Sequence, residues 1–129
     1  MCSSDLDPAG LDVVVASNLF GDILTDLAAA VQGGMGMAAS ANLAPGSDRP
    51  GLFEPVHGSA PDIAGRGVAN PAGAVWSAVL MLEHLGEEDA AGALMTALEH
   101  VCRDGPRTRD LGGDAGTSEV GGAIVARLG

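Results

Sequence analysis

The chain has 129 residues, enough for one domain or for a piece of a larger domain. Its 6 basic and 17 acidic side chains give a net charge of −11, which argues against non-specific binding to nucleic acid or to an anionic membrane. Two cysteines and the absence of a long apolar run argue against a disulfide framework and a membrane-spanning segment, so we expect a cytoplasmic protein.

The first predicted element is a buried, parallel β-strand over Leu11–Ala16, because this stretch is β-branched and almost wholly apolar. The residues before it differ, since Met1–Leu6 lacks periodicity and resembles a translated sequencing-adaptor fragment. We therefore expect residues 1–6 to be a non-native start, with the native chain entering near Asp7.

A helix is predicted to follow the strand, capped by Ser17 or Asn18 and ended by glycines after Gln32. Asp22 and Asp26 are four residues apart, a spacing that puts both carboxylates on one helical face, roughly 6 Å apart at Cβ. A second face is apolar and should be buried; it carries Leu19, Ile23, Leu27 and Val31. Two adjacent carboxylates suit Mg²⁺ or Mn²⁺, although acids at this spacing often form only a solvated face.

The next segment contains Gly34-Met35-Gly36-Met37-Ala38-Ala39, which has the form of a dinucleotide-binding fingerprint. That fingerprint requires a strand before it and a helix after it. Here a helix precedes it and an extended segment, 37–43, follows, so we do not expect it to bind a dinucleotide in that way. A turn-rich loop over 44–51 then leads to a short extended piece over 52–56.

A long polar loop over 57–71 interrupts the regular elements, and loops of this kind are usually functional or disordered. Three helices are predicted after it. Asn70 and Pro71 open the first, which runs to about Leu85 and is apolar nearly all round, so it must be buried. The second runs from Glu87 to about Arg103, with one apolar face. After a glycine-rich connection over 108–116, Thr117 is expected to cap the third, whose apolar face carries Val120, Ile124 and Leu128.

Four motifs in the same order resemble the signatures of the isocitrate/isopropylmalate dehydrogenase family. They are residues 18–26 with the Gly-x-Gly that follows, Phe53-Glu54-Pro55-Val56-His57-Gly58-Ser59-Ala60-Pro61-Asp62-Ile63, Gly67-Val68-Ala69-Asn70-Pro71 and Asp110-Leu111-Gly112-Gly113. The resemblance covers about residues 8–128. Within the family, Ala41-Asn42-Leu43, Trp76-Ser77 and residues 81–86 look more like the tartrate/D-malate dehydrogenase branch.

The resemblance implies an α/β fold, namely a C-terminal fragment of the isopropylmalate dehydrogenase-like fold. Residues 7–33 would end the smaller domain, which forms the dimer and holds the metal, and residues 34–129 would be the C-terminal half of the larger NAD-binding domain. Members of the family are homodimers, so a homodimer is expected for the full-length protein.

The resemblance also assigns roles to individual residues. Asp22 and Asp26 match the metal-binding aspartates, whose Mg²⁺ or Mn²⁺ chelates the substrate hydroxyl and a carboxylate. The loop that wraps the adenosine side of NAD is matched by His57, Gly58, Ser59 and Ala60. Asp62 matches the position that favours NAD over NADP, and Asn70 a residue that contacts adenine. Each also has a structural alternative: His57 as a structural histidine whose hydrogen bonds are satisfied, Asp62 as an acid that begins a short helix, and Asn70 as a helix cap.

The predicted parent is an NAD-dependent, decarboxylating dehydrogenase of a 2-hydroxy acid, with tartrate or D-malate as the first choice of substrate and 3-isopropylmalate as the alternative. NADP-dependent isocitrate oxidation is disfavoured by Asp62. The chain lacks the family's substrate-clamping arginines, its catalytic tyrosine and lysine and a further metal aspartate, and contains no Tyr. A catalytically inactive binding or assembly fragment is therefore the alternative for the chain as it stands.

Overall fold

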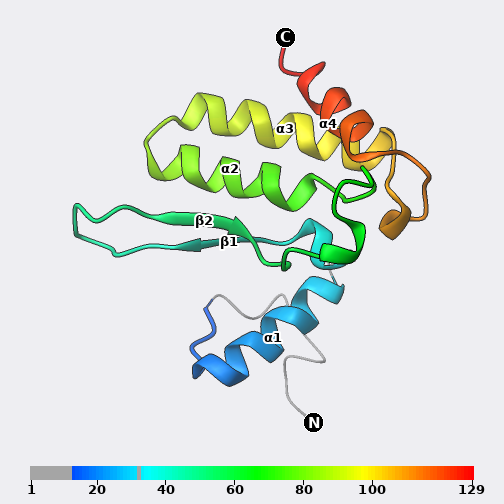
Figure 1. Cartoon of the computed structure of the whole chain (residues 1–129). Helices are drawn as coiled ribbons and strands as arrows, with labels where there is room; N and C mark the ends of the chain where they lie inside the picture. Colours follow the sequence, from blue (N-terminus) through cyan, green and yellow to red (C-terminus); the bar gives the residue numbers. More distant parts are fainter. Residues whose placement is uncertain (1–12, 32) are drawn as a thin grey trace.

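The computed structural model describes residues 13–31 and 33–129. A two-stranded antiparallel sheet, β1 (Ala39–Asn42) and β2 (Leu52–Pro55), lies in the middle of the molecule (Figure 1). On one side of it lie α2 (Ala72–His84) and α3 (Glu88–Asp104), with α4 (Thr117–Val125) against α3. On the other side lies α1 (Asn18–Val31). Mixed helices and strands confirm the predicted class.

The sheet forms where the sequence predicted extended segments. Ala39 pairs with Pro55 and Asn42 with Leu52, so the turn-rich loop joins two adjacent antiparallel strands. The strand predicted over Leu11–Ala16 is wrong for its described part, because residues 13–16 are irregular and Val15 is 93% exposed. A strand needs a neighbour for its backbone hydrogen bonds, and among the described residues none pairs with this segment. The predicted non-native start, residues 1–6, lies outside the described residues.

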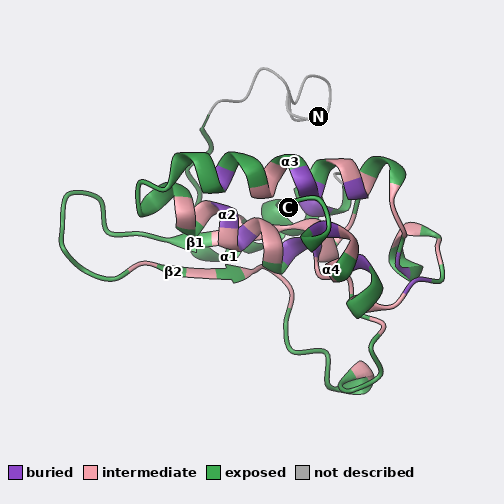
Figure 2. Cartoon of the chain, turned by 90° about the horizontal axis from the view of Figure 1, so that it is seen from above, coloured by how far each residue is buried: buried purple, intermediate pink, exposed green. Residues whose placement is uncertain are grey.

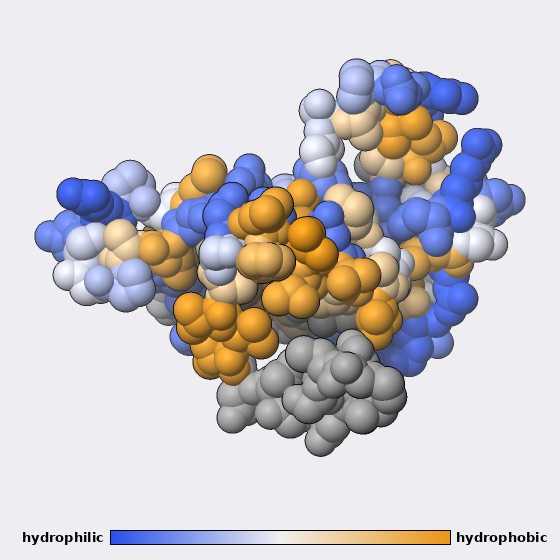
Figure 3. Space-filling view, turned by 90° about the horizontal axis from the view of Figure 1, so that it is seen from below, coloured by the Kyte–Doolittle hydropathy of each residue, from blue (hydrophilic) through white to orange (hydrophobic). Residues whose placement is uncertain are grey.

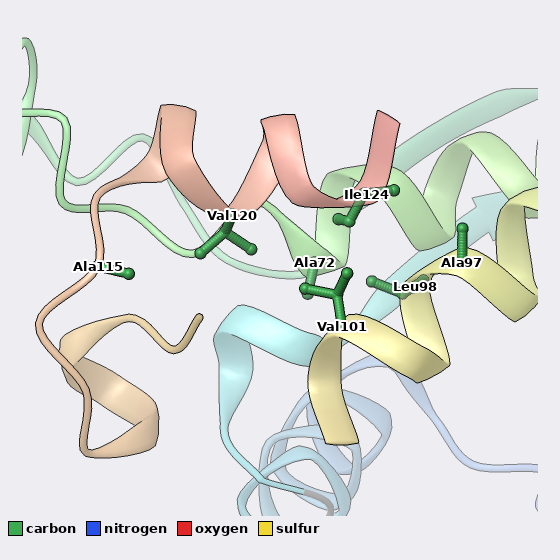
Figure 4. Close-up of a cluster of buried hydrophobic side chains, with 7 residues drawn as sticks. All are labelled: Ala72, Ala97, Leu98, Val101, Ala115, Val120 and Ile124. Carbon is green, nitrogen blue, oxygen red and sulfur yellow. The ribbon is translucent and has the colours of Figure 1, made fainter. Parts of the chain in front are cut away.

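The core lies between α2, α3 and α4, where the inward faces of the helices meet (Figures 2 and 4). Its buried members are Ala72, Ala97, Leu98, Val101, Ala115, Val120 and Ile124. The prediction that α2 is buried all round is only partly correct. Ala72, Gly73, Ser77 and Val79 are buried, and the helix contacts the sheet as well as α3, but Met81 is 39% exposed. Gly73 allows this close approach, because a Cβ there would lie 2.9 Å from the carbonyl oxygen of Ala38. Among the described helices, none is long and apolar enough to cross a membrane.

The apolar face of α1 is exposed, which corrects the expectation that it would be buried. Leu19 is 67% exposed, Leu27 59% and Val31 85%, and Ala29 is the buried residue of this helix. Figure 3 views the molecule from the side of α1 and displays apolar side chains gathered on that surface. Periodicity predicted the helix itself correctly, including its end: Gly33 and Gly34 have φ of 121° and 108°, and the Gly34 amide donates to the carbonyl of Ala29.

A small cavity of about 160 Å³ marks the place where α1 meets the rest of the described chain. Its walls come from α1, from the start of β1, from the residue after β2 and from α2. They are Thr25, Ala28, Ala29, Ala38, Ala39, Val56 and Trp76. The residues that α1 contributes are small, so this contact buries little apolar surface.

The last helix differs from its prediction in two details. Gly116, not Thr117, occupies the N-cap position of α4, and the Thr117 hydroxyl instead donates to the carbonyl of Ala69 at 2.5 Å. Val120 and Ile124 are buried as expected, but Leu128 lies beyond the helix and is 46% exposed.

Candidate functional site

An open pocket of about 1000 Å³ lies at one end of the molecule, between the loop over 57–70 and the segment over 109–118. In Figure 1 these are the green loop and the orange segment on the right. Five of the predicted cofactor-binding residues line it: His57, Gly58, Ser59, Ala60 and Asn70. The structure therefore brings most of the predicted cofactor loop onto a single concave surface of a size suited to a small organic ligand.

The loop reaches this shape through a strained residue. Ala60 has a φ of 43°, the one positive φ among the described non-glycine residues, and it precedes a short 3₁₀ helix, Pro61–Ile63. An L-residue in this region pays a steric cost of about 1–2 kcal/mol. Such strain is found mainly where the surrounding structure fixes a functional conformation. Its position in the pocket lining is consistent with a loop shaped for a ligand.

Asp62 lies in the first turn of this short helix and is exposed. It is not among the residues that line the pocket, although its neighbours Ala60 and Ile63 are. The geometry agrees with the simple structural interpretation of an acid at a helix start. Its role in choosing between NAD and NADP stays a prediction.

Three hydrogen bonds join the two walls of the pocket. The Asn70 side-chain amide donates to the carboxylate of Asp110 at 2.8 Å. The Thr117 hydroxyl donates to the carbonyl of Ala69, and the Thr117 backbone amide donates to the carbonyl of Gly67 at 2.8 Å. Because the partners are far apart in sequence, these bonds hold together segments that the chain itself does not connect closely.

Asn70 also acts as the predicted cap. Its Oδ1 accepts a hydrogen bond from the backbone amide of Ala72 at 3.0 Å, although the helix is assigned from Ala72 onward. One residue of disagreement at a helix boundary is ordinary. The side chain thus both starts α2 and lines the pocket.

The pocket is richer in positive charge than the chain around it. Arg66 and Arg109 line it, two of only 6 basic residues in a chain with a net charge of −11. Asp110 is the acidic residue in the lining, and its carboxylate accepts the Asn70 hydrogen bond. Arginine pairs well with phosphate oxygens through its planar, multiply donating guanidinium. The lining therefore favours an anionic ligand.

His57, the first residue of the loop over 57–70, is half-buried. Its Nδ1 lies 3.0 Å from the carbonyl oxygen of Gly58. A carbonyl only accepts, so this contact requires the proton on Nδ1 and leaves Nε2 of the neutral ring as an acceptor. The ring is thus held by the loop and still lines the pocket, and its role in binding the cofactor stays a prediction.

The predicted metal ligands lie elsewhere, on α1. Asp22 and Asp26 are exposed, one helical turn apart, and the Asn18 side-chain amide lies 3.4 Å from Asp22 Oδ2. Neither lines the pocket. In the described part of the chain no three His, Cys, Asp or Glu side chains gather into a metal site. Two exposed carboxylates on consecutive turns fit two ligands of a hard cation, with the remaining oxygens supplied from outside the pair.

Several lining residues were not predicted. Gly36, Arg109, Asp110 and Thr117 all line the pocket. Asp110 belongs to one of the four family motifs, which gives it no individual role, and Gly36 belongs to the Gly-x-Gly that follows residues 18–26. The structural context confirms that the dinucleotide-binding fingerprint is absent there, because α1 precedes the glycines and β1 follows them. A polar residue inside a glycine-rich connection was the available signal for Asp110.

Comparison with known proteins agrees with the motifs. Residues 6–124 match the sequence model of the family described as isocitrate/isopropylmalate dehydrogenase. A probable tartrate dehydrogenase/decarboxylase of Bacillus subtilis is 54% identical over 121 residues, which are 94% of this chain and 34% of that protein. A 3-isopropylmalate dehydrogenase of Anaeromyxobacter dehalogenans is 54% identical over 122 residues, 94% of this chain and 34% of that protein.

The fold is similar as well. The crystal structure of isocitrate dehydrogenase from Methylococcus capsulatus superimposes with a TM-score of 0.86 at 45% identity, covering 98% of this chain and 37% of that one. The chain thus spans about a third of the length of the curated relatives it matches. On the family match and the shared fold, the chain belongs to the isocitrate/isopropylmalate dehydrogenase family.

Proposed function

We propose that the chain forms the cofactor-binding pocket and part of the metal site of an NAD- and Mg²⁺- or Mn²⁺-dependent oxidoreductase. The enzyme would oxidise a 2-hydroxy acid that bears a neighbouring carboxylate, with loss of CO₂. The observation that carries this proposal is the pocket, in which the loop from His57 to Ala60 and two arginines surround a space of about 1000 Å³. The decarboxylating activity is named in several relatives, among them the probable tartrate dehydrogenase/decarboxylase of Bacillus subtilis.

In this proposal each wall of the pocket has a task. Gly58 and Ala60 present backbone and small side chains, so a flat ring and a ribose can approach closely. Arg66 and Arg109 neutralise the phosphates, and His57 Nε2 accepts a hydrogen bond from the ligand. Asp62 lies beside the lining and not in it; from there it would accept a hydrogen bond from a ribose hydroxyl and oppose a 2′-phosphate, which favours NAD over NADP.

The metal part of the proposal rests on α1. Asp22 and Asp26 would provide two oxygen ligands for the cation, which when bound supplies Lewis acidity at the substrate oxygens. The exposed apolar face of the same helix favours a homodimer of the full-length protein, in which a second copy would cover Leu19, Leu27 and Val31 and so remove apolar surface from water. We also propose a cytoplasmic location, which suits the proposed role of a soluble metabolic enzyme.

Tartrate or D-malate is the proposed substrate, and 3-isopropylmalate the alternative. One relative named for tartrate and one named for 3-isopropylmalate each match this chain at 54% identity. A second candidate function is binding or assembly without turnover. It is favoured by the composition, since the chain contains no Tyr and its 6 basic residues are all arginine, so neither a tyrosine nor a lysine is present for acid–base work.

The test is calorimetric titration of the 129-residue chain with NAD and, separately, with NADP. We expect NAD to bind and the R109Q variant to bind about tenfold more weakly, since a charge-assisted hydrogen bond is lost. R127Q, which removes an exposed arginine outside the pocket, is the control and should bind as the unaltered chain does. Absence of NAD binding, or equal effects of the two substitutions, would contradict the proposal.

Two further measurements address the metal and turnover. Mn²⁺ should broaden the amide resonances of α1, and D22N with D26N should abolish this effect while D48N, in an exposed loop, should not. The chain alone should form no NADH from D-malate with NAD and Mn²⁺. NADH formation would refute the non-catalytic alternative and require an acid–base pair within the chain.

A further inference from the structure

Both polar atoms of the Asn70 side chain, Oδ1 and Nδ2, form hydrogen bonds. Its Oδ1 accepts from the amide of Ala72 at 3.0 Å, while its Nδ2 donates to Asp110 Oδ2 at 2.8 Å and lies 3.7 Å from the sulfur of Met37. A flip of the amide would turn an oxygen towards the Asp110 carboxylate and an NH₂ group towards the Ala72 N–H. Both contacts would then be repulsive, so the amide has a single favourable orientation.

The space for this pair is provided by a third segment. A Cβ at Gly36 would lie 3.0 Å from Asp110 Oδ2 and 3.2 Å from Asn70 Cβ. Gly36 therefore allows the carboxylate and the amide to meet at hydrogen-bond distance. Asn70, Asp110 and Gly36 all line the pocket, and they come from three segments separated along the chain.

We propose that Asp110 is a positioning residue of the pocket: its carboxylate orients the Asn70 amide and thereby fixes both the start of α2 and the adjacent wall of the cofactor site. The bond joins positions 40 residues apart, so it ties the glycine-rich segment over 109–118 to the loop over 57–70. A negatively charged acceptor suits this task, because a carboxylate accepts only and rejects the flipped amide. The consequence for the ligand rests on the proposed function, whereas the consequence for the Asn70 amide does not.

The test compares three variants of the whole 129-residue chain. D110A removes the acceptor, D110N keeps an oxygen in the same place, and D114A removes an exposed carboxylate from the same segment. Hydrogen exchange at the Ala72 amide and the Asn70 side-chain resonances report the positioning, and calorimetric titration reports the affinity for NAD.

We expect D110A to exchange the Ala72 amide faster and to bind NAD about fivefold more weakly, since one charge-assisted hydrogen bond in a solvated setting is lost. D110N should keep most of the protection of the Ala72 amide and most of the affinity for NAD, and D114A should change neither quantity. The proposal is overturned if D110A behaves as D114A does, or if faster exchange leaves the affinity of an NAD-binding chain unchanged. If the unaltered chain binds no NAD, the proposed function fails, while the exchange and resonance data still decide whether Asp110 positions Asn70.

Discussion

The two sides of the sheet differ in how far their apolar side chains are covered. On one side, α2, α3 and α4 bury a continuous cluster that includes Leu98, Val101 and Ile124. On the other, α1 has an equally clear apolar stripe, yet Leu19 and Leu27 are more than half exposed. The comparison teaches that periodicity predicts a helix and its face, while burial depends on whether another element supplies a matching surface.

Replacement of one leucine on each side of the sheet by alanine should give the largest difference in the free energy of unfolding. Leu98 is 4% exposed and Leu27 59%, so L98A should lower the free energy of unfolding by about 3 kcal/mol and L27A by less than about 0.5 kcal/mol. Urea denaturation followed by far-ultraviolet circular dichroism measures both. A comparable loss for L27A would mean that the α1 stripe is covered in solution, as a homodimer requires, and its dependence on protein concentration would then identify the second copy.

Glycine substitutions sharpen the contrast at the level of the backbone. A Cβ at Gly113 would overlap the carbonyl oxygen of Arg107, whereas a Cβ at Gly21 in α1 would meet nothing within 4 Å. G113A should therefore cost about 2 kcal/mol through displaced backbone, while G21A should stabilise by about 1 kcal/mol through helix propensity. Denaturation midpoints check both signs. Equal and small effects would mean that the segment over 107–115 is not packed as the structure describes.

The smallest expected effect concerns the loop beside the pocket. Ala60 has a φ of 43°, which glycine adopts without a steric penalty. A60G should stabilise the chain by about 0.5 kcal/mol, because relief of strain slightly exceeds the added entropy of the unfolded chain. Thermal unfolding of A60G beside the unaltered chain measures it. A clear loss of stability would show that Ala60 is held by contacts of its methyl group.

Much of the fold could be predicted because it is local. The stop of α1 at consecutive glycines, the opening of α2 at Asn70 and the two extended segments of the sheet all follow from short-range patterns. The strand, over its described residues 13–16, and the capping role of Thr117 were wrong for a shared reason. Each depended on a partner distant in sequence: a strand that the described chain does not offer, or the carbonyl of Ala69 that took the Thr117 hydroxyl.

The residues of the candidate site likewise fall into those that a local motif predicts and those that depend on a contact distant in sequence. The loop from His57 to Ala60 was predicted from a contiguous motif, and the structure places it in the pocket. The opposite wall, with Arg109 and Asp110, was not assigned a role, because its contact with Asn70 joins residues 40 positions apart. Spacing along one helix predicted that Asp22 and Asp26 share a side, but no local pattern places that side relative to the pocket.

The small cavity between α1 and the rest of the described chain has a practical consequence. Trp76, one of its walls, is the single tryptophan of a chain without tyrosine, so ultraviolet emission excited in this protein arises almost entirely from one indole. Separation of α1 from the sheet would expose that ring to water and shift its emission to longer wavelength while the other helices stay folded. The emission wavelength of Trp76 therefore reports whether α1 stays packed against the rest of the molecule.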